Sequence, residues 1–152
     1  PPLNLIDCER TMSRTAFGMY SRYFAQRLHS QLLERQAAHG GVVLPEGYRR
    51  PRGLREFDER YTAPAAGFDS ADHYYRSSSS DQFVSDIQTP TQIIASRDDP
   101  LIPIGNLLSL KLPKMVTRHV TDHGGHLAFV GRGHDDADRY WIDWRVVDWV
   151  TL

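Results

Sequence analysis

Two short strand-like runs in the second half of the chain constrain its fold more than any other feature. Residues 91–96 form an apolar run typical of a buried strand, and residues 114–121 read as a second strand with β-branched valines. A helix is expected between them over 104–112, and another after them over 137–150. The order strand, helix, strand, helix predicts a parallel sheet and therefore an α/β fold class.

This predicted sheet is too small to be stable by itself. Two short parallel strands do not make an independent sheet, and parallel sheets are normally buried on both faces. The chain of 152 residues begins with Pro1-Pro2 and no methionine, so we expect it to be the C-terminal portion of a longer α/β protein. Such a fragment would expose the flank of its sheet, which predicts self-association.

The first half of the chain is expected to be helical. Hydrophobic spacing and capping signals predict helices over 5–14, 16–38, 54–61, 71–75 and 81–85. In the longest helix, one apolar stripe at three- and four-residue steps is predicted to face the core: Phe17, Tyr20, Phe24, Leu28 and Leu32.

Local signals place the ends of these helices. Gly40-Gly41 is expected to end the long helix, and Ala63-Pro64 is expected to stop the helix that begins near Leu54. Ser70 is positioned to cap the next helix. The serines from 77 to 80 are interpreted as a turn and an N-cap rather than a nucleophile, because nothing around them resembles a strand-to-helix elbow.

The last predicted helix has one apolar face. Its tryptophans are interpreted as core residues and not as a binding platform, because helical spacing alone explains their positions. That face comprises Tyr140, Trp141, Trp144 and Val147, whereas the residues predicted to lie off it are Asp143, Arg145 and Asp148.

Composition argues against several classes of partner. The formal net charge is −1 and the pI is near 6.8, so no basic excess indicates nucleic acid and no polybasic run indicates a membrane surface. No apolar run approaches the ~18 residues that a membrane-spanning helix needs. Cys8 is the only cysteine, so no intrachain disulfide can form, which suits a reducing compartment and predicts a cytoplasmic protein.

Acidic residues and histidines follow the two predicted strands. Asp98 and Asp99 come after the first strand, and His123 and His126 come after the second. Open parallel sheets carry their chemistry beyond the carboxyl ends of the strands, where a carboxylate can fix the tautomer of an imidazole and stabilise its protonated form. Gly124-Gly125 is expected to turn the loop tightly enough for His126 to point back across the strand ends.

The order of Asp99 and His126 along the chain matches that of one large enzyme fold, in which the nucleophile comes first, the acid second and the histidine last. Asp99 precedes His126 by 27 residues (126 − 99), with one helix and one strand between them. In that arrangement a serine precedes the acid in a G-x-S-x-G turn between a strand and a helix. The chain contains no such motif, and Cys8 lacks the flanking glycines.

The stretches "TPTQIIASRDDPLIP" and "HVTDHGGHLAFV" resemble the C-terminal part of the α/β-hydrolases. More narrowly, they resemble the YheT-like subfamily, whose members carry D-D-P after the seventh strand and H-G-G-H-x-x-F after the eighth. The stretches "LREFDERYTAPAAGF" and "ADHYYRSSSS" are similar to that subfamily's segment between the sixth and seventh strands, a helical cap over the active site. The resemblance implies a cap region over residues 1–88 and the C-terminal βαβα part of the catalytic domain over residues 89–152.

The resemblance also implies roles for single residues. Asp99 matches the triad acid, with Asp98 as the alternative, and His126 matches the triad base. The parent protein would be a serine hydrolase that acts on small-molecule carboxylic esters without a cofactor. The serine, its elbow and the oxyanion-hole loop have no counterpart here, so the chain alone is predicted to be inactive as an esterase.

Two other functions fit parts of the sequence. A zinc site is suggested by histidines and acids that lie close in the sequence: His119, Asp122, His123, His126, His134, Asp135 and Asp136. The strand character before Asp122 and the glycine pair after it argue against the helix that such spacing needs. A non-catalytic interaction module would use the apolar stripe of the long helix, which a lid helix explains equally well.

Overall fold

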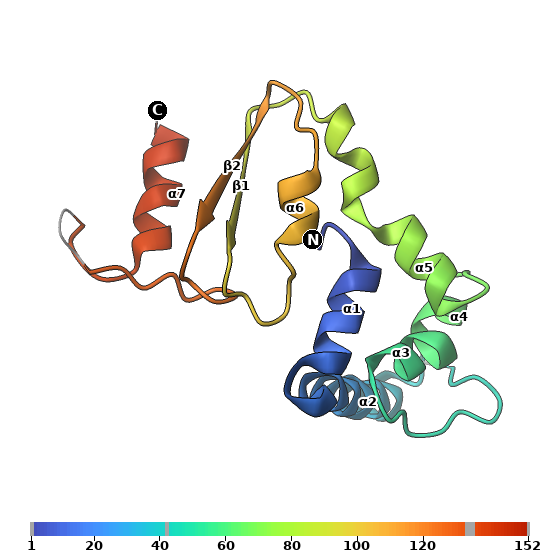
Figure 1. The fold of residues 1–152 in the computed structure, drawn as a ribbon. Helices are drawn as coiled ribbons and strands as arrows, with labels where there is room; N and C mark the ends of the chain where they lie inside the picture. The colour runs from blue at the N-terminus through green and yellow to red at the C-terminus, as the bar shows by residue number, and fades with distance from the viewer. Residues whose placement is uncertain (1, 42, 133–135, 152) are drawn as a thin grey trace. The chain divides into compact units, whose positions relative to one another are not determined.

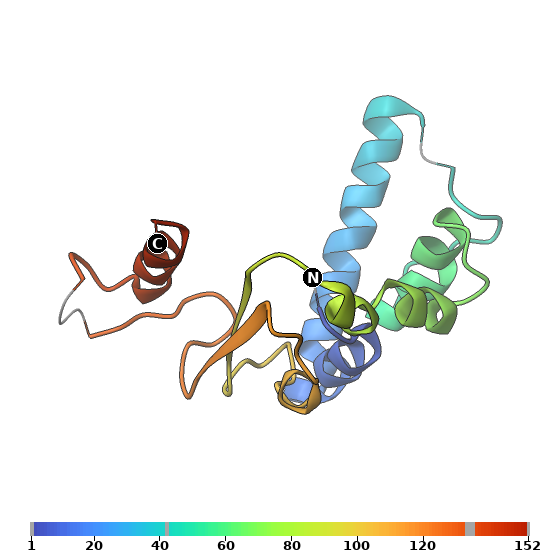
Figure 2. The same ribbon diagram turned by 90° about the horizontal axis from the view of Figure 1, so that it is seen from above.

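The computed structural model describes residues 2–41, 43–132 and 136–151. The chain divides into two compact units, Pro1–Gln82 and Phe83–Leu152. The first unit is helical and the second contains a pair of strands, as Figure 1 and Figure 2 show. No helix in the described ranges is long and apolar enough to cross a membrane.

The first unit consists of helices joined by turns. Its elements are α1 (Leu5–Arg14), η1 (Thr15–Gly18), α2 (Met19–His39), α3 (Leu54–Phe57), the π-helical turn η2 (Asp58–Thr62), α4 (Ala63–Ala65) and α5 (Ala71–Ser78), followed by the 3₁₀ segment η3 (Ser80–Asp86). Asn4 caps α1 by accepting a hydrogen bond from the Asp7 amide at 3.1 Å. Ser70 caps α5 by accepting from the His73 amide at 3.1 Å, which confirms the predicted cap.

The core of the first unit lies between α2 and α3. Ala25, Leu32 and Phe57 are buried there. Four half-buried side chains pack against them: Leu28, Leu44, Tyr48 and Tyr61. The part of the predicted stripe that holds Leu28 and Leu32 therefore faces the core, as expected.

The start of the long helix differs from the prediction. Helix α2 begins at Met19 and not near Ala16, because Ala16, Phe17 and Gly18 have left-handed backbone with φ of 48°, 54° and 75°. A right-handed helix cannot continue through such residues. Phe17 is consequently 94% exposed instead of lying in the core, and Tyr20 is exposed as well.

The helix that begins at Leu54 also runs further than predicted. The elements α3, η2 and α4 follow one another to Ala65, so Pro64 does not stop the helical path. A proline inside a regular α-helix clashes with the carbonyl four residues earlier. The wider π-helical turn directly before α4 shifts those carbonyls, which accommodates the proline ring.

Serines around the end of α5 have local structural roles. The Ser79 hydroxyl donates to the Tyr75 carbonyl at 2.6 Å and accepts from the Leu5 amide at 3.0 Å. The Ser80 hydroxyl donates to the Pro2 carbonyl at 3.0 Å. These bonds to the backbone agree with the interpretation of this run as turn and capping residues.

The second unit is built around two parallel strands, β1 (Thr91–Ser96) and β2 (Val116–Thr121). Ser96 pairs with Thr121, so both strands end at the same edge. Helix α6 (Gly105–Ser109) connects the strands, and α7 (Trp141–Thr151) follows β2. This order confirms the predicted βαβα pattern and its parallel pairing, and it is compatible with part of an α/β fold.

Helices α6 and α7 lie on opposite faces of the strand pair (Figure 1). Arg118 of β2 donates to the carbonyl of Leu107 in α6 at 2.7 Å. Its neighbour His119 contacts the rings of Trp141 and Trp149 in α7, with centroids 5.3 and 6.0 Å away. Successive side chains of a strand point to opposite faces, so alternate residues of β2 reach the two helices.

The strands are less buried than predicted. Ile93 and Ile94 are half-buried, and of the β1 residues only Ser96 is buried. One short helix on each face covers a two-stranded sheet incompletely, which explains the difference.

The last helix matches the predicted apolar face only in part. Trp141 and Trp144 are half-buried, as expected. The helix begins at Trp141, and Tyr140 and Val147 are 59% and 48% exposed instead of lying in the core. Arg145, predicted to lie off the apolar face, extends over the Trp141 ring at 5.9 Å and pairs with Asp136 at 2.6 Å. The strand presents a histidine ring to this helix, which favours stacked aromatic and cationic side chains over an aliphatic stripe.

Candidate functional site

The carboxylate of Asp99 is held rigidly just beyond the end of β1. Its Oδ1 atom accepts hydrogen bonds from the amides of Leu101 and Ile102 at 2.8 and 3.0 Å. The Asp99 side chain is only 10% exposed. Pro100 favours extended backbone at the residue before it, which delays any following helix and opens the space for this turn. The second carboxylate oxygen is thereby left to face the neighbouring loop.

His126 meets that second oxygen. Its Nδ1 lies 2.9 Å from Asp99 Oδ2, and the imidazole is 41% exposed. When Nδ1 carries the proton, it donates to the carboxylate, and Nε2 then holds a lone pair that can accept a proton. The pair therefore has the geometry of an oriented general base, and the carboxylate would stabilise the imidazolium once it forms.

Asp98 has a different set of partners. Its Oδ1 accepts from the Gly125 amide at 2.8 Å and lies 2.8 Å from the Ser96 hydroxyl, while Oδ2 lies 3.3 Å from His123 Nδ1. The Gly125 amide, followed by the Ser96 hydroxyl, holds the pKa of Asp98 below its usual range. Of the two adjacent aspartates, Asp99 thus faces His126, whereas Asp98 binds the loop at His123 and Gly125.

Ser96, at the end of β1, also contacts this loop. Its hydroxyl lies 2.7 Å from the Gly125 carbonyl as well as 2.8 Å from Asp98, and the residue is 2% exposed. Ser96 was not among the predicted site residues. The available signal was a serine as the last residue of an apolar strand, two residues before an acidic pair.

The two glycines before His126 have separate functions. Gly125 has φ of +58°, the left-handed conformation that the tight turn requires. A side chain on Gly124 would lie 2.6 Å from the Phe129 ring, so only glycine fits beneath that ring. The loop therefore turns at one glycine and packs closely at the other, in agreement with the predicted tight turn.

The histidines proposed as zinc ligands are not gathered into one cluster. His119 lies against the tryptophans of α7, whereas His123 and His126 face separate aspartates. Within residues 2–41, 43–132 and 136–151, no group of three His, Cys, Asp or Glu side chains could hold a metal ion. His134 and Asp135 lie outside the described residues.

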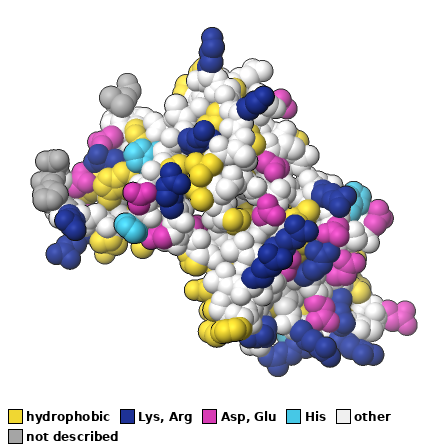
Figure 3. Space-filling view, in the orientation of Figure 1, with side chains coloured by type: hydrophobic (Ala, Val, Ile, Leu, Met, Phe, Trp, Pro, Cys, Tyr) yellow, Lys and Arg dark blue, Asp and Glu magenta, His cyan; other side chains and the backbone are white. Residues whose placement is uncertain are grey.

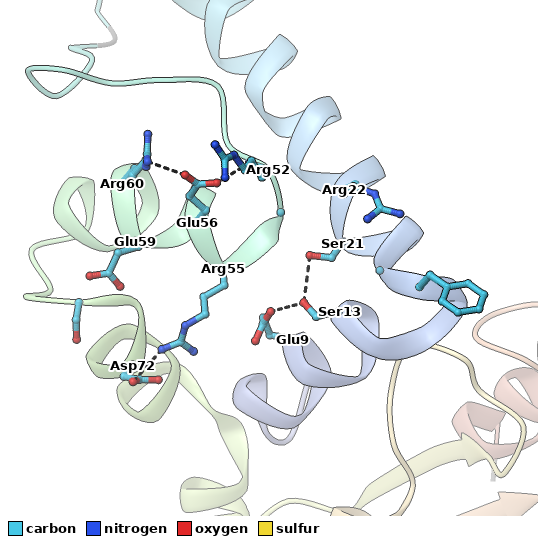
Figure 4. A pocket seen from close by; sticks show the side chains of 14 residues that line it. Glu9, Ser13, Ser21, Arg22, Arg52, Arg55, Glu56, Glu59, Arg60 and Asp72 are labelled. Atoms are coloured by element: carbon cyan, nitrogen blue, oxygen red, sulfur yellow. Dashed lines mark hydrogen bonds and ion pairs between the residues drawn. The ribbon is translucent and has the colours of Figure 1, made fainter.

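A cavity of about 890 Å³ lies in the first unit (Figure 4). Its wall contains four arginines and four acidic residues. Arg55 pairs with Asp72 at 2.9 Å and Arg60 pairs with Glu56 at 2.6 Å. Charges of both signs are also interspersed over the surface of this unit (Figure 3). Because the charges of the wall are balanced and largely paired with one another, the cavity does not indicate a ligand of one sign.

A buried polar pair lies among the helices of the same unit. The Tyr75 hydroxyl donates to Asp58 Oδ2 at 2.6 Å, and the Thr62 hydroxyl donates to Oδ1 at 2.7 Å. Burial raises the pKa of Asp58, and burial together with the bond to Asp58 raises the pKa of Tyr75. Each Asp58 oxygen already accepts a hydrogen bond from a neighbouring hydroxyl, which indicates a structural role for this pair.

Comparison with known proteins connects this geometry to a family. The chain is 32% identical to the Escherichia coli protein named "Putative esterase YheT" over an alignment of 154 positions, which covers 99% of this chain and 45% of that protein. It is 43% identical over 86 residues to the Saccharomyces cerevisiae medium-chain fatty acid ethyl ester synthase/esterase 2, covering 55% of this chain and 19% of that protein.

A third relative aligns with most of the chain. The monoacylglycerol lipase of Saccharomyces cerevisiae is 27% identical over an alignment of 153 positions, which covers 92% of this chain and 32% of that protein. No family model and no solved structure matches the chain. The chain spans about half the length, or less, of these curated relatives.

Proposed function

Since the chain belongs to the YheT-like α/β-hydrolases, we propose that it supplies the acid and the base of a Ser-Asp-His triad that hydrolyses carboxylic esters. The observation that carries this proposal is the 2.9 Å contact between His126 Nδ1 and Asp99 Oδ2 beyond the ends of two parallel strands. The names of the relatives support the ester class, because they include an esterase and a lipase.

In the proposed reaction, His126 Nε2 takes the proton of a serine hydroxyl as that oxygen attacks the ester carbonyl. His126 then returns the proton to the leaving alcohol. Water attacks the acyl-serine that remains, and its proton passes through His126 to the serine oxygen as the carboxylic acid leaves. Asp99 keeps Nδ1 protonated and stabilises the imidazolium between the two transfers. Asp98 and Ser96 act as positioning residues, because they fix the loop that carries His126.

The 152 residues contain no G-x-S-x-G motif, so we propose that they do not turn over esters by themselves. The assignment of residues 1–88 to a cap stays a prediction that rests on the resemblance. The alternative of a non-catalytic interaction module stays a prediction, and the described histidines do not form a metal cluster.

A chimera tests the proposal. Residues 1–152 would replace the matched segment of the Escherichia coli relative, about 45% of that protein, and hydrolysis would be measured on a p-nitrophenyl ester that the intact relative is first shown to cleave. We expect the folded chimera to be active and the 152-residue chain to be inactive. A folded chimera without activity, or turnover by the chain alone that survives His126→Ala, would contradict the proposal.

A further inference from the structure

The corner between α1 and α2 exposes an unusual amount of apolar surface. Phe17 is 94% exposed, Met19 61% and Tyr23 59%, and Tyr20 is exposed beside them. These residues follow one another at the turn and the first helical turn of α2. We propose that this corner, residues 14–23, docks on an anionic lipid surface. The proposal does not depend on ester hydrolysis.

The backbone holds the phenylalanine outward at a conformational cost. Ala16 and Phe17 both have positive φ, which is disfavoured for residues with a side chain. Such conformations persist where the surrounding structure imposes them, and they concentrate at functional segments. Here the imposed conformation places an aromatic ring in solvent, where it contributes nothing to the core of the unit.

The chain segment that forms the corner is basic in sequence. Between Glu9 and Glu34 the chain has four arginines and no acidic residue, although its net charge is −1. Arg14 and Arg22 are exposed on either side of the turn. The Arg22 guanidinium lies close to the turn itself, with Nη1 3.8 Å from where a methyl group on Gly18 would be. Figure 4 shows Arg22 extending from the first turn of α2.

Acidic side chains near this corner are already engaged. Glu9 is buried and accepts a hydrogen bond from the Ser13 hydroxyl. Glu56 and Asp72, across the cavity, pair with Arg60 and Arg55. Arg22 shares the cavity wall with these acids and with Glu59. Arg14 and the exposed Arg27 lie outside that wall, so their positive charge remains to attract anionic groups.

A bilayer surface offers both kinds of partner that the corner needs. Exposed aromatic and methionine side chains enter the boundary between headgroups and acyl chains, and arginines bind the phosphates just above it. Tyrosine suits the headgroup level because its ring is apolar and its hydroxyl is polar. The arginines form no polybasic run in the sequence, so this basic and apolar surface exists only once the corner has folded.

Flotation of the 152-residue chain with vesicles tests the proposal. We expect binding to phosphatidylcholine vesicles that contain about 30% phosphatidylglycerol, and little binding to pure phosphatidylcholine. Phe17→Gly should weaken binding about tenfold through loss of the inserted ring. Arg14→Gln and Arg22→Gln should each weaken it about fivefold.

The strained backbone supplies a matched control. Phe17→Gly and Ala16→Gly relieve similar backbone strain, but only the first removes the ring, so Ala16→Gly should bind like the wild type. Phe83→Ser removes a side chain that is 56% exposed in the second unit and should also leave binding unchanged.

Three results would overturn the proposal. The first is absence of binding to the anionic vesicles by the wild-type chain. The second is equal binding by wild type and Phe17→Gly, which would mean that no ring inserts. The third is a change in the sedimentation coefficient of lipid-free protein on Phe17→Gly, which would make the corner an interface between copies of the chain.

Discussion

His126 and Asp99 face each other across the ends of two parallel strands, with Nδ1 of the histidine 2.9 Å from Oδ2 of the aspartate. The other oxygen of Asp99 is occupied by two backbone amides, so the carboxylate has one orientation and one oxygen for the imidazole. A base oriented in this way is what a serine nucleophile requires.

This contact predicts the tautomer of His126. In the neutral imidazole the proton should reside on Nδ1, because the hydrogen bond to Asp99 selects that form. Asp99→Ala should shift the population toward the Nε2–H form, as seen in long-range ¹H–¹⁵N spectra. Asp122→Ala, which removes a carboxylate paired with Arg97, is the control and should leave the His126 pattern unchanged. The same pattern in wild type and Asp99→Ala would argue against the oriented base.

Ser96 should contribute to the stability of the second unit. Ser96→Ala leaves Asp98 and the Gly125 carbonyl without the buried hydroxyl, which should cost about 1–2 kcal/mol of unfolding free energy. Urea unfolding followed by tryptophan fluorescence reports on this unit, because all three tryptophans lie in it. Ser85→Ala, at an exposed serine, should change the free energy by less than about 0.5 kcal/mol. Equal effects of the two substitutions would contradict a structural role for Ser96.

The loop that carries His126 should loosen in acid. Hydrogen bonds from Gly125 and Ser96 favour the ionised form of Asp98 and hold its pKa below the usual 3.8. Its contribution to loop order is therefore present above pH 3.8 and is lost as the pH falls through the lowered pKa. The Gly125 amide resonance should titrate with a midpoint below 3.8 and should lose this transition in Asp98→Asn. A midpoint above 3.8 would contradict the hydrogen-bonded arrangement.

The first unit should lose stability in alkali. Burial and the bond to Asp58 raise the pKa of Tyr75 above its usual 10.0, so the folded unit keeps the phenol neutral. The resulting stability is fully present below pH 10.0 and falls as the pH rises beyond it, where the unfolded tyrosine ionises first. Circular dichroism at increasing pH should show helix loss that Tyr75→Phe shifts to higher pH. Tyr23→Phe, at an exposed tyrosine, should not shift it.

The sequence predicted the parallel strand pair and the meeting of Asp99 and His126, since both follow from element order and from the shared edge of parallel strands. It did not separate Asp98 from Asp99, because adjacent residues differ only in which way the turn directs them. The left-handed backbone at Ala16 and Phe17 had no local signal, because neither residue is a glycine. Tyr140 and Val147 were wrongly placed on the buried face of α7, because contact of Trp141 and Trp149 with His119 selects that face.

The most direct test of the central claim compares two histidines of the same loop in the active chimera. His126→Gln should lower the rate of ester hydrolysis about ten-thousandfold, because it removes the base. His123→Gln removes an exposed side chain paired with Asp98 and should cost no more than about fivefold. A large loss confined to His126→Gln is the result that we predict. Similar rates for the two variants would contradict the assignment of His126 as the catalytic base.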